Sequence, residues 1–270
     1  MMPHDSDLEA ALEAAHRAGG LILAAYESFV AIPDARADIT TEVDRQSQET
    51  ILQYLSQRFP TDALCAEEAT PTLAAAVHSG SRMWVVDPID GTRGFAQKNG
   101  EYSVMIALLI EGRPAVGVVL EPASHRLTYA VRGSGCWRRD GDAGPTACRV
   151  TTTRELNEAT LTQSRSRKAG ERSPLVQALQ PKLIRETYSA GIKLALVARG
   201  DADYYVNSYE AFHDWDICAG QILVEEAGGV VTGLGGEPIV YGTPGAWQRR
   251  GLLGSNGLLH SAAVERCRLR

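Results

Sequence analysis

The sequence predicts a mixed α/β (α+β) fold in which helices pack against sheets. Three patterns favour it: amphipathic helices open the chain, antiparallel strands follow, and strand-like segments alternate with helix-like ones after about residue 148. A chain of 270 residues, 44% apolar and 22% charged, is typical of a soluble globular protein. It is long enough for one large domain or for two closely packed lobes.

The first part of the chain predicts two helices. Residues 7–30 place apolar side chains at three- and four-residue spacing, the pattern of one buried stripe. Gly19-Gly20 within this segment would allow a neighbouring element to approach closely. Residues 42–59 form a second such stripe, for which Thr40 or Thr41 is the expected N-cap.

The middle of the chain predicts an antiparallel meander. Residues 102–110, 115–120 and 126–131 are apolar and β-rich, and hairpin-length connections separate them.

The polar, glycine-containing stretch 138–145 is the expected boundary between two lobes, 1–145 and 146–270, of one compact catalytic unit. In the second lobe, alternating segments are typical of helices packed on a sheet. The expected strands are 159–163, 183–187, 203–206, 229–232 and 251–253, and the expected helices are 174–180, 191–199, 216–227 and 257–268.

Composition and charge argue against nucleic-acid and membrane partners. The formal net charge of −6 and the pI near 5.6 differ from the basic surface that nucleic-acid binding usually requires. No apolar stretch approaches the roughly 18 residues that span a bilayer, and the acidic start lacks a signal peptide's basic region. Five cysteines without a Cys-x-x-Cys pair suggest reduced thiols. These features predict a cytoplasmic protein.

The stretch from Trp84 to Phe95, Trp-Val-Val-Asp-Pro-Ile-Asp-Gly-Thr-Arg-Gly-Phe, carries the strongest functional signal. An apolar strand is expected to end at Asp87, because proline cannot continue a ladder of hydrogen bonds. Asp87 and Asp90 would converge, and they repel each other unless a hard cation such as Mg²⁺ lies between them. Thr92 is the expected N-cap of a short helix whose free N–H groups, from Gly91 onward, would hold a phosphate. A bare Asp-x-x-Asp is usually an ordinary acidic turn, but the full string favours metal beside phosphate.

Further acidic positions have both a structural and a functional interpretation. Asp44 in the first turn of the second helix and Asp216 at the start of a later helix would stabilise the helix ends or face the metal site. Glu67 and Glu68 end a short apolar run, as Asp87 does, although adjacent glutamates are usually surface residues. Position alone leaves both interpretations open.

Together these motifs resemble the inositol monophosphatase superfamily of Mg²⁺-dependent, lithium-sensitive phosphomonoesterases. The resemblance implies a layered αβαβα sandwich of the inositol monophosphatase and fructose-1,6-bisphosphatase type. It covers nearly the whole chain, because three motifs occur in the family's order: Glu67-Glu68, Asp87-Pro-Ile-Asp90-Gly-Thr92 and Trp215-Asp216-x-x-Ala-Gly.

Residue by residue, the resemblance implies a metal site and the residues that activate water. The implied ligands of two or three Mg²⁺ ions are Glu67, Asp87, Asp90, Asp216 and the main-chain carbonyl of Ile89. The implied catalytic residues are Asp44, Thr92 and Glu67, of which Asp44 and Thr92 would orient and deprotonate the attacking water. The N–H groups of Gly91 and Thr92 would hold the phosphate during in-line displacement.

Within the superfamily, three segments resemble CysQ-type 3'(2'),5'-bisphosphate nucleotidases: Gly91-Thr-Arg-Gly-Phe95, Gln163-Ser-Arg-Ser166 and Ser189-Ala-Gly-Ile-Lys193. A substrate with two phosphates needs a cation away from the metals, which Lys193 and Arg165 could supply. Alternatively, Lys193 extends its ammonium group to solvent and Arg165 is simply solvated. The remaining expected substrate contacts are Ser164, Gly91, Thr92 and Asp216.

Other members of the superfamily are alternatives. Inositol-specific members carry a glutamate before the Trp-Asp motif, with which Glu210 does not align clearly. The Gly-Thr-Arg sequence at 91–93 is also compatible with histidinol-phosphate phosphatases. The lysine that the family places before Asp44 has no clear counterpart, although Arg36 could replace it.

Two other classes of function are alternatives. A non-catalytic scaffold could use the same fold, but the complete set of acidic residues argues against it. No Gly-x-Ser-x-Gly, His-Glu-x-x-His or P-loop motif favours a different hydrolase. The resemblance to CysQ-type enzymes thus implies a cytoplasmic Mg²⁺-dependent phosphomonoesterase of sulfur metabolism that converts adenosine 3',5'-bisphosphate to AMP. Its partner would be a small phosphate ester, without nucleic acid or membrane, and a homodimer is compatible with the resemblance.

Overall fold

The computed structural model describes residues 4–36, 38–165 and 173–268. Its helices are α1 (Asp5–Ser28), α2 (Glu42–Arg58), α3 (Pro71–Ala74), α4 (Thr92–Ala96), α5 (Pro174–Leu179), α6 (Ala190–Ala198), α7 (Asp214–Glu226) and α8 (His260–Arg268). Short 3₁₀ turns lie at Pro122–Ser124, Leu156–Glu158 and Pro244–Ala246. Ser166, predicted in a substrate-binding segment, lies outside the described residues.

The strands form two main sheets. The first has the order β1 (Ala63–Ala66), β2 (Arg82–Asp90), β3 (Ser103–Ile110), β4 (Arg113–Glu121), β5 (Arg126–Val131), β6 (Gly135–Asp140) and β7 (Thr146–Ala147). In this sheet β1 is parallel to β2, and the later pairs are antiparallel. The second has the order β12 (Val230–Thr232), β14 (Leu252–Ser255), β10 (Tyr204–Asn207), β8 (Thr160–Gln163) and β9 (Leu183–Glu186). A separate small pair joins β11 (Phe212–His213) to β13 (Trp247–Gln248).

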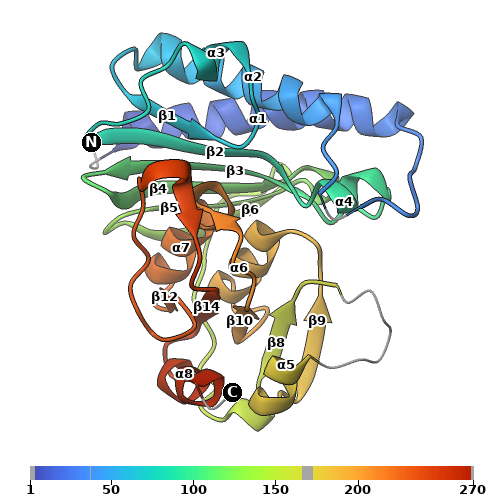
Figure 1. Cartoon of the computed structure of the whole chain (residues 1–270), viewed down its shortest axis with the longest axis vertical. Coiled ribbons are helices and arrows are strands. Elements are labelled where there is room, and N and C mark those ends of the chain that lie inside the picture. The colour runs from blue at the N-terminus through green and yellow to red at the C-terminus, as the bar shows by residue number, and fades with distance from the viewer. Residues whose placement is uncertain (1–3, 37, 166–172, 269–270) are drawn as a thin grey trace.

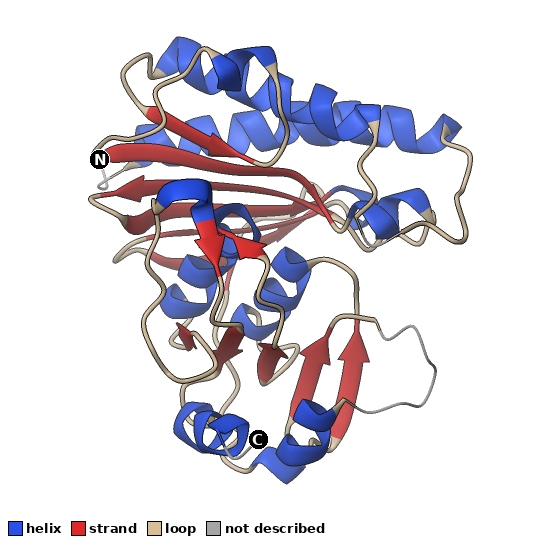
Figure 2. Cartoon of the chain, viewed as in Figure 1, coloured by secondary structure: helices blue, strands red, loops and turns tan. Residues whose placement is uncertain are grey.

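Helical layers and sheets alternate through the molecule (Figure 1). One outer layer, α1 and α2, covers the first sheet, and α6 and α7 lie between this sheet and the second one. On the far side of the second sheet lie α5 and α8, as the colouring by element type in Figure 2 makes clear. This arrangement is the layered αβαβα sandwich that the sequence predicted.

Both faces of the first sheet are buried, and β3 shows how. Its residues Val104, Ile106 and Leu108 pack with α1 and α2, whereas the alternate residues Met105, Ala107 and Leu109 pack with α6 and α7. Successive side chains of a strand point to opposite faces, so an uninterrupted apolar run is what a sheet buried on both sides requires. The site lies at the edge of this core.

The predicted N-terminal helices are confirmed. Thr41 rather than Thr40 caps α2, since its side chain accepts a hydrogen bond from the N–H of Val43. A Cβ added at Gly19 would lie 2.6 Å from Cδ2 of Leu120, which explains the close packing expected there, whereas Gly20 has nothing within 4 Å.

The predicted meander is confirmed, but the first sheet extends further than the sequence indicated. The stretch 138–145, expected as a loop, begins with the second half of β6, and β7 follows directly after it. The polar side chains that suggested a loop pair with one another here: Asp140 forms ion pairs with Arg126 at 2.5 Å and with Arg138 at 3.0 Å. Polar side chains occupy the solvent side of a half-exposed strand, which explains the high polarity of residues 138–140. The division into lobes at residue 145 stays a prediction.

Among the residues that the structure describes, none of the helices is both long and apolar enough to cross a bilayer.

Candidate active site

The end of β2 places Asp87 and Asp90 at an irregularity of the sheet. Asp87 lies opposite Met105 and Asp90 opposite Ser103, and the register shifts between these two pairs. Pro88 stays out of the ladder, as its missing N–H requires. The prediction that the strand ends there is wrong, however, because β2 resumes after the irregularity and reaches Asp90. An irregularity of this kind re-aims side chains at the end of a strand.

The N-cap of α4 is Gly91, not Thr92 as predicted. Its φ of 86° lies in the left-handed region, which glycine adopts without steric cost, and an added Cβ would lie 2.7 Å from the carbonyl oxygen of Glu101. Thr92 is the first helical residue, so its hydroxyl is available to other partners. Its Oγ1 lies 2.8 Å from Oδ1 of Asp44 and 2.9 Å from the carbonyl oxygen of Ile89.

Asp44 is fully buried and stabilises the start of α2. Its Oδ2 accepts hydrogen bonds from the N–H of Thr41 at 2.9 Å and from the Thr41 hydroxyl at 2.5 Å. The structural interpretation of Asp44 is therefore confirmed. Its second oxygen, Oδ1, accepts a hydrogen bond from Thr92, so this bond joins the cap of α2 to the start of α4. Burial raises the pKa of the Asp44 carboxyl.

Asp216 joins Asp87 and Asp90 to form the acidic cluster. One carboxylate oxygen from each of the three lies within 4.8 Å of the others. Asp216 does not open its helix as predicted: α7 starts at Asp214, and Asp216 is its third residue. Its Oδ2 accepts a hydrogen bond of 2.6 Å from the N–H of His213, the N-cap. The helix cap leaves the other oxygen of Asp216 for the cluster.

Burial and repulsion favour the neutral forms of Asp87 and Asp216. Asp87 is 2% exposed, and its burial, followed by repulsion from Glu67 and Asp90, raises its pKa well above the usual range. Removal from water, with added repulsion from Asp90, raises the pKa of Asp216 to about 7. A cation among the carboxylates would reverse this preference.

The donor set of the cluster fits Mg²⁺. Its ligands would be carboxylate oxygens and the Ile89 carbonyl oxygen, the hard donors that Mg²⁺ prefers. Within the described ranges, Oδ1 of Asp87 is buried and has no hydrogen-bond partner. A buried acceptor without a partner costs free energy, and a bound cation would remove that cost.

Glu67 follows β1 directly and is not among the three carboxylates that lie within 4.8 Å of one another. Desolvation, followed by repulsion from Asp216 and Glu68, raises the pKa of Glu67 to about 8. Its neighbour Glu68 is directed toward α2 instead: the N–H of Glu68 donates to Oε1 of Gln48 at 2.7 Å, and a carboxylate oxygen of Glu68 accepts from Thr40 at 2.5 Å. The two adjacent glutamates thus have different surroundings.

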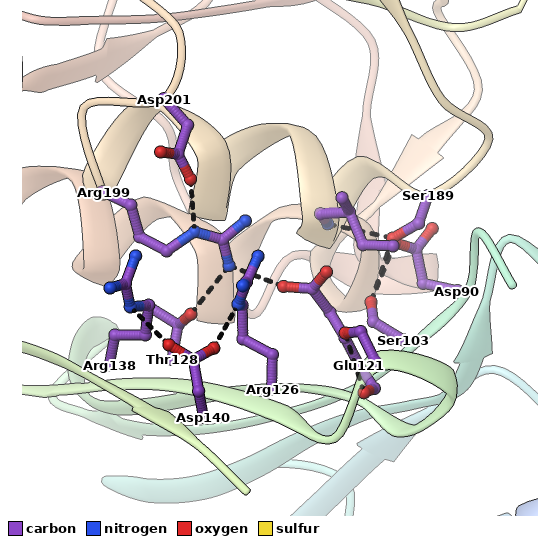
Figure 3. A network of polar contacts seen from close by, with 12 residues as sticks. Asp90, Ser103, Glu121, Arg126, Thr128, Arg138, Asp140, Ser189, Arg199 and Asp201 are labelled. Carbon is purple, nitrogen blue, oxygen red and sulfur yellow. Dashed lines mark hydrogen bonds and ion pairs between the residues drawn. The ribbon is translucent and has the colours of Figure 1, made fainter. Parts of the chain in front are cut away.

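The N-terminus of α6 holds Asp90 in place (Figure 3). Oδ2 of Asp90 accepts hydrogen bonds from the hydroxyl of Ser189 and from the N–H of Gly191, the latter at 2.6 Å. The Ser189 hydroxyl is itself 2.9 Å from that of Ser103. Sequence reasoning missed Ser103, and it assigned Ser189 only to a motif. No local pattern could reveal this contact, because Ser189 lies 99 residues after Asp90.

Lys193, predicted to contact substrate, is 1% exposed. It therefore does not extend to solvent, the alternative considered for it. Its Nζ donates to Oγ of Ser164 at 3.3 Å and to the carbonyl oxygens of Thr187 and Tyr188 at 3.1 and 2.9 Å. Burial lowers the pKa of Lys193 to about 8. The ammonium group thus anchors the segment that precedes α6.

Arg165 is exposed but is not simply solvated. It forms a two-point ion pair with Glu101, with Nε donating to Oε2 at 2.7 Å. Arg36, considered as a replacement for the family's lysine, pairs with Asp38 at 2.8 Å in an exposed loop. The predicted roles of Ser164, Arg165, Lys193 and Arg36 toward substrate stay predictions.

The fold and the acidic cluster define a metal-dependent phosphatase class. The chain belongs to the inositol monophosphatase family, whose model matches residues 4–268. Members of this family are generally Mg²⁺-dependent phosphatases, which agrees with the chemistry of the cluster.

Individual relatives carry different names. The chain is 32% identical to the histidinol-phosphatase of Mycobacterium tuberculosis, over 98% of each chain. It is 31% identical to the fructose-1,6-bisphosphatase/inositol-1-monophosphatase of Thermotoga maritima, over 84% of this chain and 82% of the relative. It is also 32% identical to the Nus factor SuhB of Pasteurella multocida, over 85% of both. Among solved structures, an IMPase of Thermotoga maritima superposes with a TM-score of 0.81 at 28% identity, covering 98% of this chain and 97% of the other.

Proposed function

We propose that the chain is a phosphomonoesterase that hydrolyses adenosine 3',5'-bisphosphate to AMP and phosphate. One observation carries the choice of substrate. Beside the acidic cluster, three cationic side chains from different segments gather at Tyr188: Arg93, Arg165 and Lys193. A metal cluster accounts for one phosphate, and a separate group of cations is what a second phosphate requires.

The acidic residues have complementary roles in this proposal. Asp87, Asp90 and Asp216, with Glu67 and the carbonyl of Ile89, would hold two or three Mg²⁺ ions. When bound, Mg²⁺ neutralises the phosphate dianion and acidifies water. Thr92 would orient the attacking water, and Asp44, hydrogen-bonded to Thr92 at 2.8 Å, would accept its proton. The raised pKa of Asp44 makes it a better base than an exposed aspartate.

A second candidate substrate is histidinol phosphate. It is favoured by similarity over almost the full length of both chains to the histidinol-phosphatase of Mycobacterium tuberculosis. The same acidic cluster would serve this ester, and only the surroundings of the leaving group would differ. The two candidates therefore make opposite demands on the cations at Tyr188, because histidinol carries positive charge and the nucleotide carries a second phosphate.

A substrate panel tests the proposal. Phosphate release is measured with Mg²⁺ from adenosine 3',5'-bisphosphate, inositol 1-phosphate, histidinol phosphate and fructose 1,6-bisphosphate, and each assay is repeated with EDTA and with lithium. We expect the highest kcat/KM with the nucleotide, inhibition by lithium and no release with EDTA. A higher value for histidinol phosphate would replace the substrate and keep the metal chemistry. No release from any ester would favour the non-catalytic scaffold.

A further inference from the structure

Tyr188 is the centre of a small polar cluster beside the acidic site. Its hydroxyl donates to Oε1 of Gln97, the C-cap of α4, at 2.9 Å, and its main-chain N–H donates to Glu101 at 3.3 Å. Guanidinium groups approach its ring from two segments, with the carbon of Arg93 at 5.1 Å and that of Arg165 at 5.8 Å from the ring centroid. These distances are typical of cation–π contacts.

The cations of this cluster differ in how many of their donors are already used. The three protons of the Lys193 ammonium match its three acceptors, at 2.9 to 3.3 Å. Arg165 is paired at two points with Glu101. Arg93 has neither kind of partner: in the described part of the chain it forms no ion pair, and its buried Nε has no acceptor.

Arg93 also has a favourable position. It is the second residue of α4, directly after Thr92, and it is half-buried, so part of the residue is reachable from solvent. The ring that it contacts belongs to the residue before Ser189, which binds Asp90. Arg93 thus follows the residues of the acidic site directly in sequence, and it shares the Tyr188 ring with Arg165, the partner of Glu101.

We propose that Arg93 is the principal residue that binds the second phosphate and so determines specificity for bisphosphates. This inference rests on the proposed function, which supplies the doubly phosphorylated substrate. The planar guanidinium offers parallel N–H donors that match two phosphate oxygens, and the ring of Tyr188 packs against it. Arg165 contributes less, because it must first leave Glu101, and Lys193 acts by positioning Thr187 and Tyr188.

The experiment compares two substrates that differ only in the second phosphate: adenosine 3',5'-bisphosphate and adenosine 3'-monophosphate. The measured quantity is the ratio of their kcat/KM values in Mg²⁺ for wild type, Arg93→Gln, Arg93→Lys and Arg165→Gln. Arg17→Gln is the matched control, since α1, the helix that carries this exposed arginine, covers the face of the first sheet opposite to α6 and α7. Circular dichroism and thermal unfolding establish that each variant is folded.

We expect Arg93→Gln to lower the ratio by about ten- to hundred-fold, mainly through KM for the bisphosphate, as expected for loss of charge-assisted hydrogen bonds. Arg93→Lys should lower the ratio less than Arg93→Gln does, and so should Arg165→Gln. Arg17→Gln should leave the ratio unchanged. If Arg93→Gln fails to fold, Arg93→Lys still tests the proposal. The ammonium group of lysine cannot fully replace the two parallel N–H donors of the guanidinium, so the ratio should still fall.

The possible failures are distinguishable. A wild type that prefers the bisphosphate, with the same ratio in Arg93→Gln, would overturn the role of Arg93 and leave the proposed function in place. An Arg165→Gln ratio that falls as far as that of Arg93→Gln would remove Arg93 as the principal residue. A wild type that does not prefer the bisphosphate would overturn the proposed function, and this inference with it.

Discussion

The two oxygens of Asp90 have different surroundings, and this difference shows how the site is built. Oδ2 is bound by the hydroxyl of Ser189 and the N–H of Gly191, which leaves the other oxygen for a cation. Asp216 is arranged in the same way, with Oδ2 bound by the N–H of His213. Ligands whose orientation is fixed by hydrogen bonds from the protein bind metal better than freely rotating ones. Main-chain donors therefore do much of the positioning.

Asp90→Asn should separate activity from stability. The amide oxygen of asparagine would keep the bonds from Ser189 and Gly191, so the amide NH₂ would turn toward the cluster, where it cannot bind a cation. We expect kcat/KM to fall at least about a hundred-fold. The metal-free protein should unfold at the same or a higher temperature, because one repelling charge is gone.

Phosphate-release kinetics and thermal unfolding in EDTA measure the two effects of Asp90→Asn. The matched control is Asp142→Asn, which changes an exposed aspartate and should alter neither quantity. Near-wild-type activity in Asp90→Asn would remove Asp90 from the metal site. A large loss of stability would mean that its charge is needed for folding.

The acidic residues of the site could be predicted from the sequence, but their supporting contacts could not. Asp87 and Asp90 follow an apolar strand within one short motif, so local pattern indicated their convergence. Ser103 and Ser189 bear no such mark, since a serine at a strand or helix start is ordinary. In the sequence, Arg93 is marked only as part of a motif. The absence of a hydrogen-bond acceptor for its Nε is a property of the folded protein.

At the scale of elements, α6 connects the acidic site to a second polar network (Figure 3). Its N-cap, Ser189, binds Asp90, and its C-cap, Arg199, is almost fully buried. Arg199 pairs with Glu121 of β4 at 2.5 Å and donates to Thr128 of β5 at 3.1 Å. Because both ends are fixed to the first sheet, α6 presents its N-terminus to Asp90 in one defined position.

Helices were easier to predict than the boundaries that matter for the site. The expected helix 191–199 is observed at 190–198, because its apolar residues and capping serine are local signals. The course of β2 past Pro88 was not predictable in the same way. It depends on pairing with β3, which lets a strand resume beyond a residue that cannot donate. Pairing between distant segments is absent from a local pattern.

Glycines in α7 and α1 make a matched test of helix packing. A Cβ added at Gly220 of α7 would lie 2.7 Å from Cβ and 2.3 Å from Cδ1 of Leu194 on α6, whereas Gly20 of α1 has nothing within 4 Å. Both substitutions to alanine gain helix propensity. We expect Gly220→Ala to destabilise the protein by about 1–2 kcal/mol net through overpacking, and Gly20→Ala to stabilise it by about 0.5–1 kcal/mol.

Chemical unfolding of the two glycine variants gives these free energies directly. Gly220→Ala should also lower phosphatase activity, because α7 carries Asp216. Equal stabilisation by both substitutions would show that α6 and α7 are not closely packed at this point.

At the scale of the whole molecule, the site lies where separate layers meet. Asp87 and Asp90 come from the first sheet and Asp216 from the helical layer beneath it, so folding itself brings like charges together. Without a cation, this proximity costs free energy, which other parts of the fold offset. Function thus reduces the stability of the metal-free protein, as often occurs at active sites.

The stability gained from Mg²⁺ should therefore increase with pH. The folded pKa values of Glu67, about 8, and Asp216, about 7, are raised above those of unfolded carboxyls, as is that of Asp87. Below about pH 4 these groups are protonated in both states and have no effect. As pH rises toward 8, the unfolded chain releases its protons first, so the metal-free folded state loses stability. Bound Mg²⁺ favours the ionised carboxylates and removes this loss.

Thermal unfolding at pH 5, 6, 7 and 8, with Mg²⁺ or with EDTA, measures the effect. We expect the Tm difference between the two conditions to be small at pH 5 and to grow to several degrees by pH 8. The control is Asp216→Asn, in which the growth should be smaller because one titrating ligand is missing. A Tm difference that is constant or largest at pH 5 would mean that Mg²⁺ does not act through these carboxylates. The raised pKa values would then belong to groups that stay neutral in the working protein.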